Sequence, residues 1–285
     1  RGDFARDLAA GRCGAKCLAV ARMKNGRRPP WDLLFLLAGA ALLFTVGIEW
    51  GLPSRRGWAG DEILPRHVAK AVERDFSHGW HTKSPPLHYQ VLAVVQAPFG
   101  PSEAGPRGVV TDSKKLLASR AVSVAMALGM LLAIFAIGTR LSNRATGLLA
   151  AVIVALSPPI VYFAKTANVE MPMLFWAAVG LWFLIRLLDE HRLRDYLGFA
   201  FCAAASIVTK DQAYALWLLT PFVIVPALAR HRREERGEAL ATDSRVGVRE
   251  ILRALVDVRL LGVLGVGLVV AVFAYRLPWN WAGLV

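Results

Sequence analysis

The chain has 285 residues, a formal net charge of +13 and 55% hydrophobic residues. Its mean hydropathy of +0.44 is unusual for a soluble protein, and the apolar residues are concentrated in blocks. The basic residues collect between these blocks and form no stripe on a soluble domain, which argues against a nucleic-acid partner and for a polytopic membrane protein. Cys13, Cys17 and Cys202 suggest neither a disulfide framework nor a zinc site.

Seven apolar segments are candidate membrane spans, each of which needs about 20 mostly apolar residues. Continuous apolar runs without alternation favour helices over barrel strands. We therefore predict an all-α, polytopic transmembrane fold with about seven spans, the fifth being the shortest. The candidate spans are residues 32–50, 118–140, 145–164, 171–188, 196–209, 213–229 and 260–275.

The distribution of arginine and lysine predicts the orientation of these spans. Residues 1–31 form a basic tail, and the joints after the second, fourth and sixth spans are rich in arginine, whereas Lys165 and Lys210 stand alone in the intervening joints. The positive-inside rule then places the N-terminus inside. Four regions follow: the inside tail, a membrane core over residues 32–229, a basic inside loop over 230–259, expected to be one surface helix, and a seventh span within 260–285. Because the chain ends soon after that span and does not begin with Met, we expect a fragment or a truncated product.

The first outside loop, residues 51–117, is predicted to contain two juxtamembrane helices. Leu64, Val68, Val72 and Phe76 recur every four residues, which indicates an amphipathic helix on the membrane surface. Residues 87–99 are apolar but number only about 13, too few to span a bilayer, and are expected to form the second helix. The Gly- and Pro-containing residues 100–115 read as a loop.

Ionisable side chains gather on the predicted outside face. A carboxylate there can orient or deprotonate an acceptor hydroxyl. A lysine can stabilise a departing phosphate. Two alternatives stay open: each group is an ordinary interfacial charge, or the paired acids cap the amphipathic helix. The candidates are Asp61, Glu62, Lys83, Glu170 and Lys210.

Four of the six histidines also lie in the first outside loop. Their spacing matches no standard metal-binding set, so interfacial use is favoured. A divalent metal is chemically conceivable, but no cofactor is predicted. These residues are His67, His78, His81 and His88.

Several short motifs, taken in order, resemble the GT-C-type membrane glycosyltransferases. The similarity is to the branch of dolichyl-phosphate-mannose protein mannosyltransferases and bacterial aminoarabinose (lipid A) transferases, and it covers about residues 33–225. The motifs are Gly60-Asp61-Glu62, Lys83-Ser84-Pro85-Pro86-Leu87, Ser119-Arg120-Ala121-Val122-Ser123, Ala155-Leu156-Ser157-Pro158-Pro159, Glu170-Met171-Pro172 and Thr209-Lys210.

The resemblance implies roles for individual residues. Asp61 matches the catalytic Asp of the family's first loop, and Glu62 the acid that often follows it. Lys83 falls one position before the charged residue that usually precedes the Pro pair. Glu170 stands where the family commonly has Asp, and Lys210 matches the Lys thought to meet the donor phosphate. Asp211 replaces a more usual Gly.

The implied activity is transfer of a hexosyl or pentosyl group from a polyprenyl-phosphate donor to a glycan, lipid or protein acceptor. Asp61 and Glu170 would be catalytic, and Glu62, Lys83 and Lys210 would bind substrate. The enzyme would lie in the cytoplasmic membrane among membrane lipids, with its active site facing outward. The alternatives are a polytopic membrane transporter and an inactive, truncated glycosyltransferase.

Overall fold

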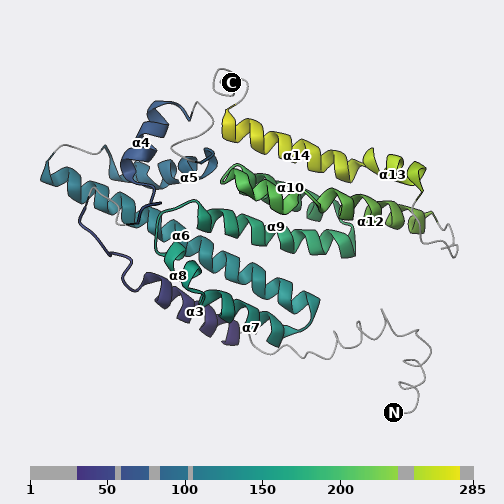
Figure 1. Ribbon diagram of the computed structural model, residues 1–285, viewed down its shortest axis with the longest axis horizontal. Coiled ribbons are helices and arrows are strands. Elements are labelled where there is room, and N and C mark those ends of the chain that lie inside the picture. Colours follow the sequence, from purple (N-terminus) through teal and green to yellow (C-terminus); the bar gives the residue numbers. More distant parts are fainter. Residues whose placement is uncertain (1–30, 55–58, 77–83, 102–104, 237–246, 277–285) are drawn as a thin grey trace, which may run out of the picture. The chain divides into compact units, whose positions relative to one another are not determined.

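The computed structural model describes residues 31–54, 59–76, 84–101, 105–236 and 247–276. Within these ranges all regular structure is helical, which confirms the predicted all-α class (Figure 1). The chain divides into two units, residues 1–36 and 37–285. The first contributes the opening turns of α3 (Trp31–Thr45), and the second contains the remaining helices.

Four helical stretches of the described chain are long and apolar enough to cross a membrane. They are α6 (Pro106–Leu141), α9 (Glu170–Glu190), the Asp211–Glu235 stretch that ends in α12 (Thr220–Glu235), and α14 (Val258–Tyr275).

A fifth span arises only if α7 (Arg144–Ala155) and α8 (Pro158–Ala164) are counted as one broken helix, bent by 70°. Adjacent prolines after residue 157 explain this break, because proline removes a helical hydrogen bond and clashes with the preceding turn. The predicted number of seven spans is therefore not confirmed. α3 and α10 (Leu193–Ile207) have 15 residues each, about 22 Å at 1.5 Å per residue, against a hydrocarbon core of about 30 Å.

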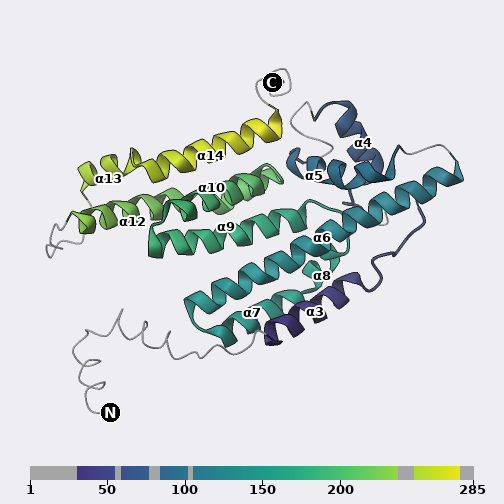
Figure 2. The ribbon, with the colours of Figure 1, turned by 180° about the vertical axis from the view of Figure 1, so that it is seen from behind.

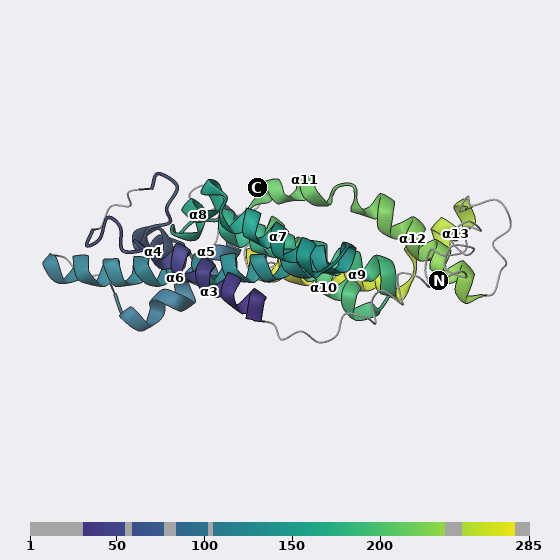
Figure 3. The same cartoon turned by 90° about the horizontal axis from the view of Figure 1, so that it is seen from below.

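Five helices of the second unit lie side by side in the order α7, α6, α9, α10 and α14 (Figures 1 and 2). The short α11 (Tyr214–Trp217) and α12 lie out of this layer, as the view from below shows (Figure 3). Leu187, Phe199, Trp217 and Leu228 belong to one buried cluster that joins α9, α10, α11 and α12. The layer holds the ends of α9 and α10 next to one another.

Two helices of the first loop lie at one end of α6 (Figure 1). They are α4 (Pro65–Glu73) and α5 (Leu87–Gln96), with a short 3-10 turn, η1 (Ala97–Phe99), after the second. Both helices are present, as predicted. The apolar side of α4, however, packs against α5, since Val68 of α4 and Leu92 of α5 belong to the same buried cluster. Val72, expected on the apolar face, is 51% exposed.

Two other segments differ from expectation. Residues 106–115, predicted as loop, are the first turns of α6, because Pro106 is suited to the first position of a helix. Residues 230–259, predicted as one helix, contain the end of α12, the separate α13 (Val248–Leu255) and the start of α14. Asp257 separates the last two helices by capping α14 through the N–H of Arg259.

Candidate functional site

A polar cavity of about 270 Å³ lies between the first loop, the start of α9 and the turn after α10. Four of the five predicted site residues line it, although Asp61 and Lys210 lie 149 residues apart in the chain. The cavity is lined by Gly60, Asp61, Glu62, Ile63, His67, Ser84, Tyr89, Asn168, Val169, Glu170, Lys210 and Gln212.

Asp61 presents an exposed carboxylate to this cavity. Among the described residues, no hydrogen bond or ion pair engages its side chain. The capping alternative is not seen, because α4 begins four residues later at Pro65, and its N-cap residue is Leu64. Asp61 is therefore available to a ligand in the cavity.

Glu62, the next residue, is buried and fully engaged. Its carboxylate accepts two hydrogen bonds from Arg120 of α6, at 2.7 Å from Nε and 3.1 Å from Nη2. It also accepts one from the backbone N–H of Ala167 at 3.2 Å. Arg120 donates in turn to the carbonyls of Ile48 and Trp50 at 2.6 and 2.8 Å.

This network joins three parts of the chain behind the cavity: the end of the first apolar segment, α6 and the approach to α9. The backbone N–H of Ile63 reinforces it by donating to the carbonyl of Ala167 at 2.6 Å. These contacts indicate that Glu62 positions the loop that carries Asp61. Its predicted contact with substrate stays a prediction.

Glu170 and Lys210 form an ion pair across the cavity wall. Glu170 is the first residue of α9, and Lys210 lies in extended backbone three residues after the end of α10. Each side chain is 23% exposed, so the pair borders the cavity and keeps access to solvent. An anion that approached Lys210 would compete with Glu170 for the ammonium group.

Asn168 holds the start of α9 in place and was not singled out from the sequence. Its Oδ1 accepts the N–H groups of Glu170 and Met171 at 2.9 and 3.1 Å, as expected of a helix cap. Its amide nitrogen donates to the carbonyls of Phe163 and Thr166 at 3.1 Å each. The available signal was an Asn two positions before the first acid of an apolar run.

Of the histidines, His67 lines the cavity and His88 does not. Burial, followed by the nearby cations of Arg66 and Lys70, lowers the pKa of His67, so its imidazole is neutral at pH 7. Among the described residues no group of three or more His, Cys, Asp or Glu side chains is arranged to hold a metal ion. His78 and His81 lie outside the described residues.

Lys83 also lies outside the described residues, so its predicted place at the site is untested. Its neighbour Ser84 is buried in the cavity lining. Asp211 begins the 3-10 turn η2 (Asp211–Ala213) beyond Lys210, and the exposed Gln212 of that turn faces the cavity.

The chain matches one protein family over its central part. Residues 110–241, a little under half of the chain, match the family model of dolichyl-phosphate-mannose-protein mannosyltransferase. The resemblance to GT-C-type membrane glycosyltransferases is confirmed. No curated protein and no solved structure matches the chain significantly.

The match indicates a membrane, mannosyltransferase-like glycosyltransferase. The matched stretch includes Arg120, Asn168, Glu170 and Lys210, whereas Asp61 and Glu62 precede it. Asp61 is therefore linked to the glycosyltransferase-like part of the chain by its position, because it lines the same cavity as Glu170 and Lys210.

Proposed function

We propose that the protein moves a hexosyl or pentosyl group from a polyprenyl-phosphate donor to a hydroxyl of a glycan, lipid or protein acceptor. The observation that carries this proposal is the convergence of an available acid, Asp61, with the Glu170–Lys210 pair on one cavity. The likeness to mannosyltransferases supports the donor class. A cytoplasmic-membrane enzyme with its N-terminus inside and this cavity outside is part of the proposal.

In the proposed reaction, the acceptor oxygen forms a bond to the anomeric carbon as the bond from that carbon to the phosphate oxygen breaks, with inversion. Asp61 orients the acceptor hydroxyl and takes its proton. Lys210 leaves Glu170 to neutralise the charge that grows on the departing polyprenyl phosphate. Because a phosphate monoester leaves as an anion, one base is sufficient. Glu170 supports the sugar or acceptor once its lysine has moved.

The test is release of polyprenyl phosphate from polyprenyl-phosphate mannose carrying a labelled polyprenyl chain. We expect Asp61→Asn to lower the turnover at least about 100-fold while donor binding persists, because general base catalysis contributes about 10²–10⁴. Glu73→Gln is the matched control, because it neutralises an exposed acid of neighbouring α4 that does not line the cavity.

Near-normal turnover of Asp61→Asn contradicts the assignment of the base. A wild-type protein that binds donor and never releases polyprenyl phosphate supports the alternative of an inactive glycosyltransferase. Net movement of intact donor across a bilayer without release supports a transporter.

A further inference from the structure

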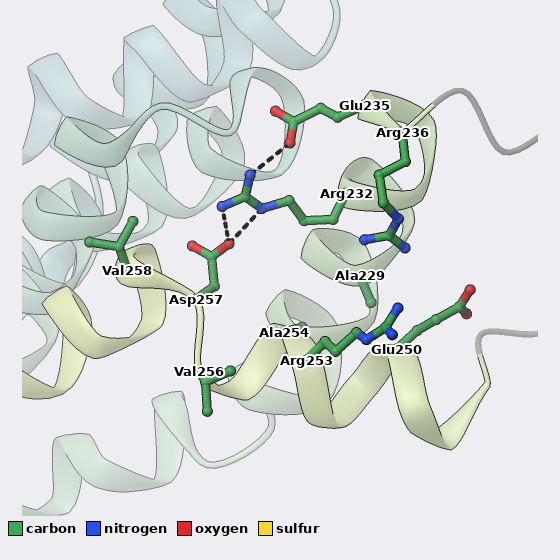
Figure 4. A pocket seen from close by; sticks show the side chains of 10 residues that line it. All are labelled: Ala229, Arg232, Glu235, Arg236, Glu250, Arg253, Ala254, Val256, Asp257 and Val258. Atoms are coloured by element: carbon green, nitrogen blue, oxygen red, sulfur yellow. Dashed lines mark hydrogen bonds and ion pairs between the residues drawn. The ribbon is translucent and has the colours of Figure 1, made fainter.

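A second cavity, of about 510 Å³, lies between α12 and α13 and is separate from the candidate active site (Figure 4). The Asp211–Glu235 stretch starts beside Lys210 and ends at this cavity, so the two cavities lie at opposite ends of one candidate span. Nothing in the proposed transfer reaction requires the second cavity.

The acids that line this cavity are held by its walls. Asp257 accepts hydrogen bonds from Arg232 at 2.6 Å and from the N–H of Arg259 at 2.8 Å. Burial opposes its charged form, but these two donors keep the pKa of Asp257 below its usual value. Glu235 pairs with Arg232 at 3.0 Å, and Glu250 accepts from the N–H of Gly247 at 2.9 Å.

Two further arginines line the cavity from opposite sides. Arg236 comes from the end of α12 and Arg253 from the last turn of α13, and both side chains reach into the same gap (Figure 4). Both residues are exposed. Two guanidinium groups that converge on one space favour an anion between them, most strongly a phosphate.

Apolar side chains flank these arginines. α13 is amphipathic, with Val248 at 74% and Leu252 at 58% exposure on one face. Val256, directly after α13, is 71% exposed, and Val258, the first residue of α14, is 61% exposed. Val256 and Val258 also line the cavity. A soluble phosphate would not need such a border, whereas a phospholipid places a charged phosphate directly beside acyl chains.

We propose that this cavity binds the headgroup phosphate of an anionic phospholipid, in the leaflet opposite the candidate active site. Arg236 and Arg253 hold the phosphate, and the exposed apolar face of α13 with Val256 and Val258 contacts the acyl chains. The lipid thereby fastens α13 and the cavity end of α12 to the bilayer surface.

The experiment measures retention of phosphatidylglycerol by the purified full chain in phosphatidylcholine nanodiscs, read by native mass spectrometry. We expect Arg253→Gln or Arg236→Gln to weaken phosphatidylglycerol binding about fivefold each and the double variant about 25-fold, at about 1 kcal/mol per arginine. Arg253→Lys should retain part of the binding. Arg249→Gln is the matched control: Arg249 is an exposed arginine on the same helix that does not line the cavity.

Three results overturn the proposal: wild-type retention by the double variant, an equal loss with Arg249→Gln, or displacement of the lipid by millimolar inorganic phosphate. The second would show diffuse attraction to a charged surface, and the third a site for free phosphate. Because both arginines are exposed, circular dichroism of each variant should stay unchanged and so confirm that folding is retained.

Discussion

The buried Glu62–Arg120 pair is the charged contact on which the position of the Asp61 loop depends. Both side chains have 1% exposure or less, so removal of one partner leaves the other charge uncompensated. Such a loss typically costs about 3–5 kcal/mol. We expect Glu62→Gln to lower the free energy of unfolding in detergent by about that amount and to reduce activity as the Asp61 loop shifts.

The control for this prediction is Asp75→Asn, which breaks an exposed pair with Arg276. Exposed pairs contribute about 0–1 kcal/mol, so this variant should unfold almost like the wild type. Equal stability of Glu62→Gln and Asp75→Asn would contradict the positioning role of Glu62 and favour its predicted role in substrate binding.

Substitutions in the Glu170–Lys210 pair should, unlike Glu62→Gln, change the kinetics of the reaction and not the stability of the fold. Lys210→Met should lower kcat/KM for the donor about 10- to 150-fold, because a hydrogen bond to a charged group contributes about 1.5–3 kcal/mol. Glu170→Gln should have a smaller effect. Since the two side chains touch, the double variant should lose less than the sum of the single losses.

Lys165→Met is the matched control for the lysine. Lys165 donates to the carbonyl of Val46 at 2.7 Å and lies outside the candidate active site. Its replacement should leave donor kinetics within about twofold, as is usual for substitutions away from a site. Strict additivity of the Glu170 and Lys210 effects would show that the pair does not act together.

At the scale of helices, α5 carries a buried histidine that links its packing to pH. His88 is 1% exposed, and neither ring nitrogen has a hydrogen-bond partner among the described residues. Burial lowers the pKa of His88 from 6.5 to about 3. As pH falls below 6.5, the unfolded chain binds a proton that the folded chain does not, so stability falls until about pH 3.

Between pH 6.5 and 5 this difference removes about 2 kcal/mol, at about 1.4 kcal/mol per pH unit. His88→Leu should abolish that part of the pH dependence and be at least as stable as the wild type at pH 7, because it removes unpaired buried polar atoms. Unfolding titrations at the two pH values measure the difference. His67→Asn should keep most of the slope; a slope that persists in His88→Leu would place its origin elsewhere.

Helices were predictable where one local signal dominated. Apolar runs with few charges placed α6, α9 and α14 correctly, to within two residues except at the start of α6. There Pro106 and the polar residues after it resemble a loop in sequence, since their helical state depends on α6 continuing past its apolar part beside α4 and α5. The apolar content of residues 145–164 predicts one continuous span, whereas the two prolines at 158 and 159 break it into α7 and α8.

The candidate site was predictable as a set of residues but not as a set of contacts. Charge alternation between spans put Asp61, Glu170 and Lys210 on one face, and the structure gathers them around one cavity. The partner of Glu62 lies 58 residues away. The sequence around Arg120 does not show that it pairs with Glu62, because the packing of α6 decides which residues at that separation come into contact. Its one sequence signal is that it lies in a motif that carries the family resemblance.

At the scale of the whole molecule, two polar ends separated by apolar helices predict a crossing of the bilayer. α9 has 21 residues, with Glu170 at the cavity and Glu190 in contact with Arg140 at its other end. At 1.5 Å per residue this helix is about 32 Å long, close to the thickness of a hydrocarbon core. The site cavity and the α12–α13 cavity should therefore face opposite aqueous phases.

Cysteine labelling tests this arrangement in a background where Cys13, Cys17 and Cys202 are replaced by alanine. Gln212→Cys reports the site cavity and Arg249→Cys reports α13, since both positions are exposed. If the proposed orientation holds, a membrane-impermeant maleimide added to intact cells labels position 212 and not 249, and inverted vesicles reverse the result. Labelling of 249 alone in cells would invert the orientation and place the active site inside. Labelling of both positions from one side would show that the helices between them do not cross the bilayer, and the outward-facing transfer reaction would then lose its physical basis.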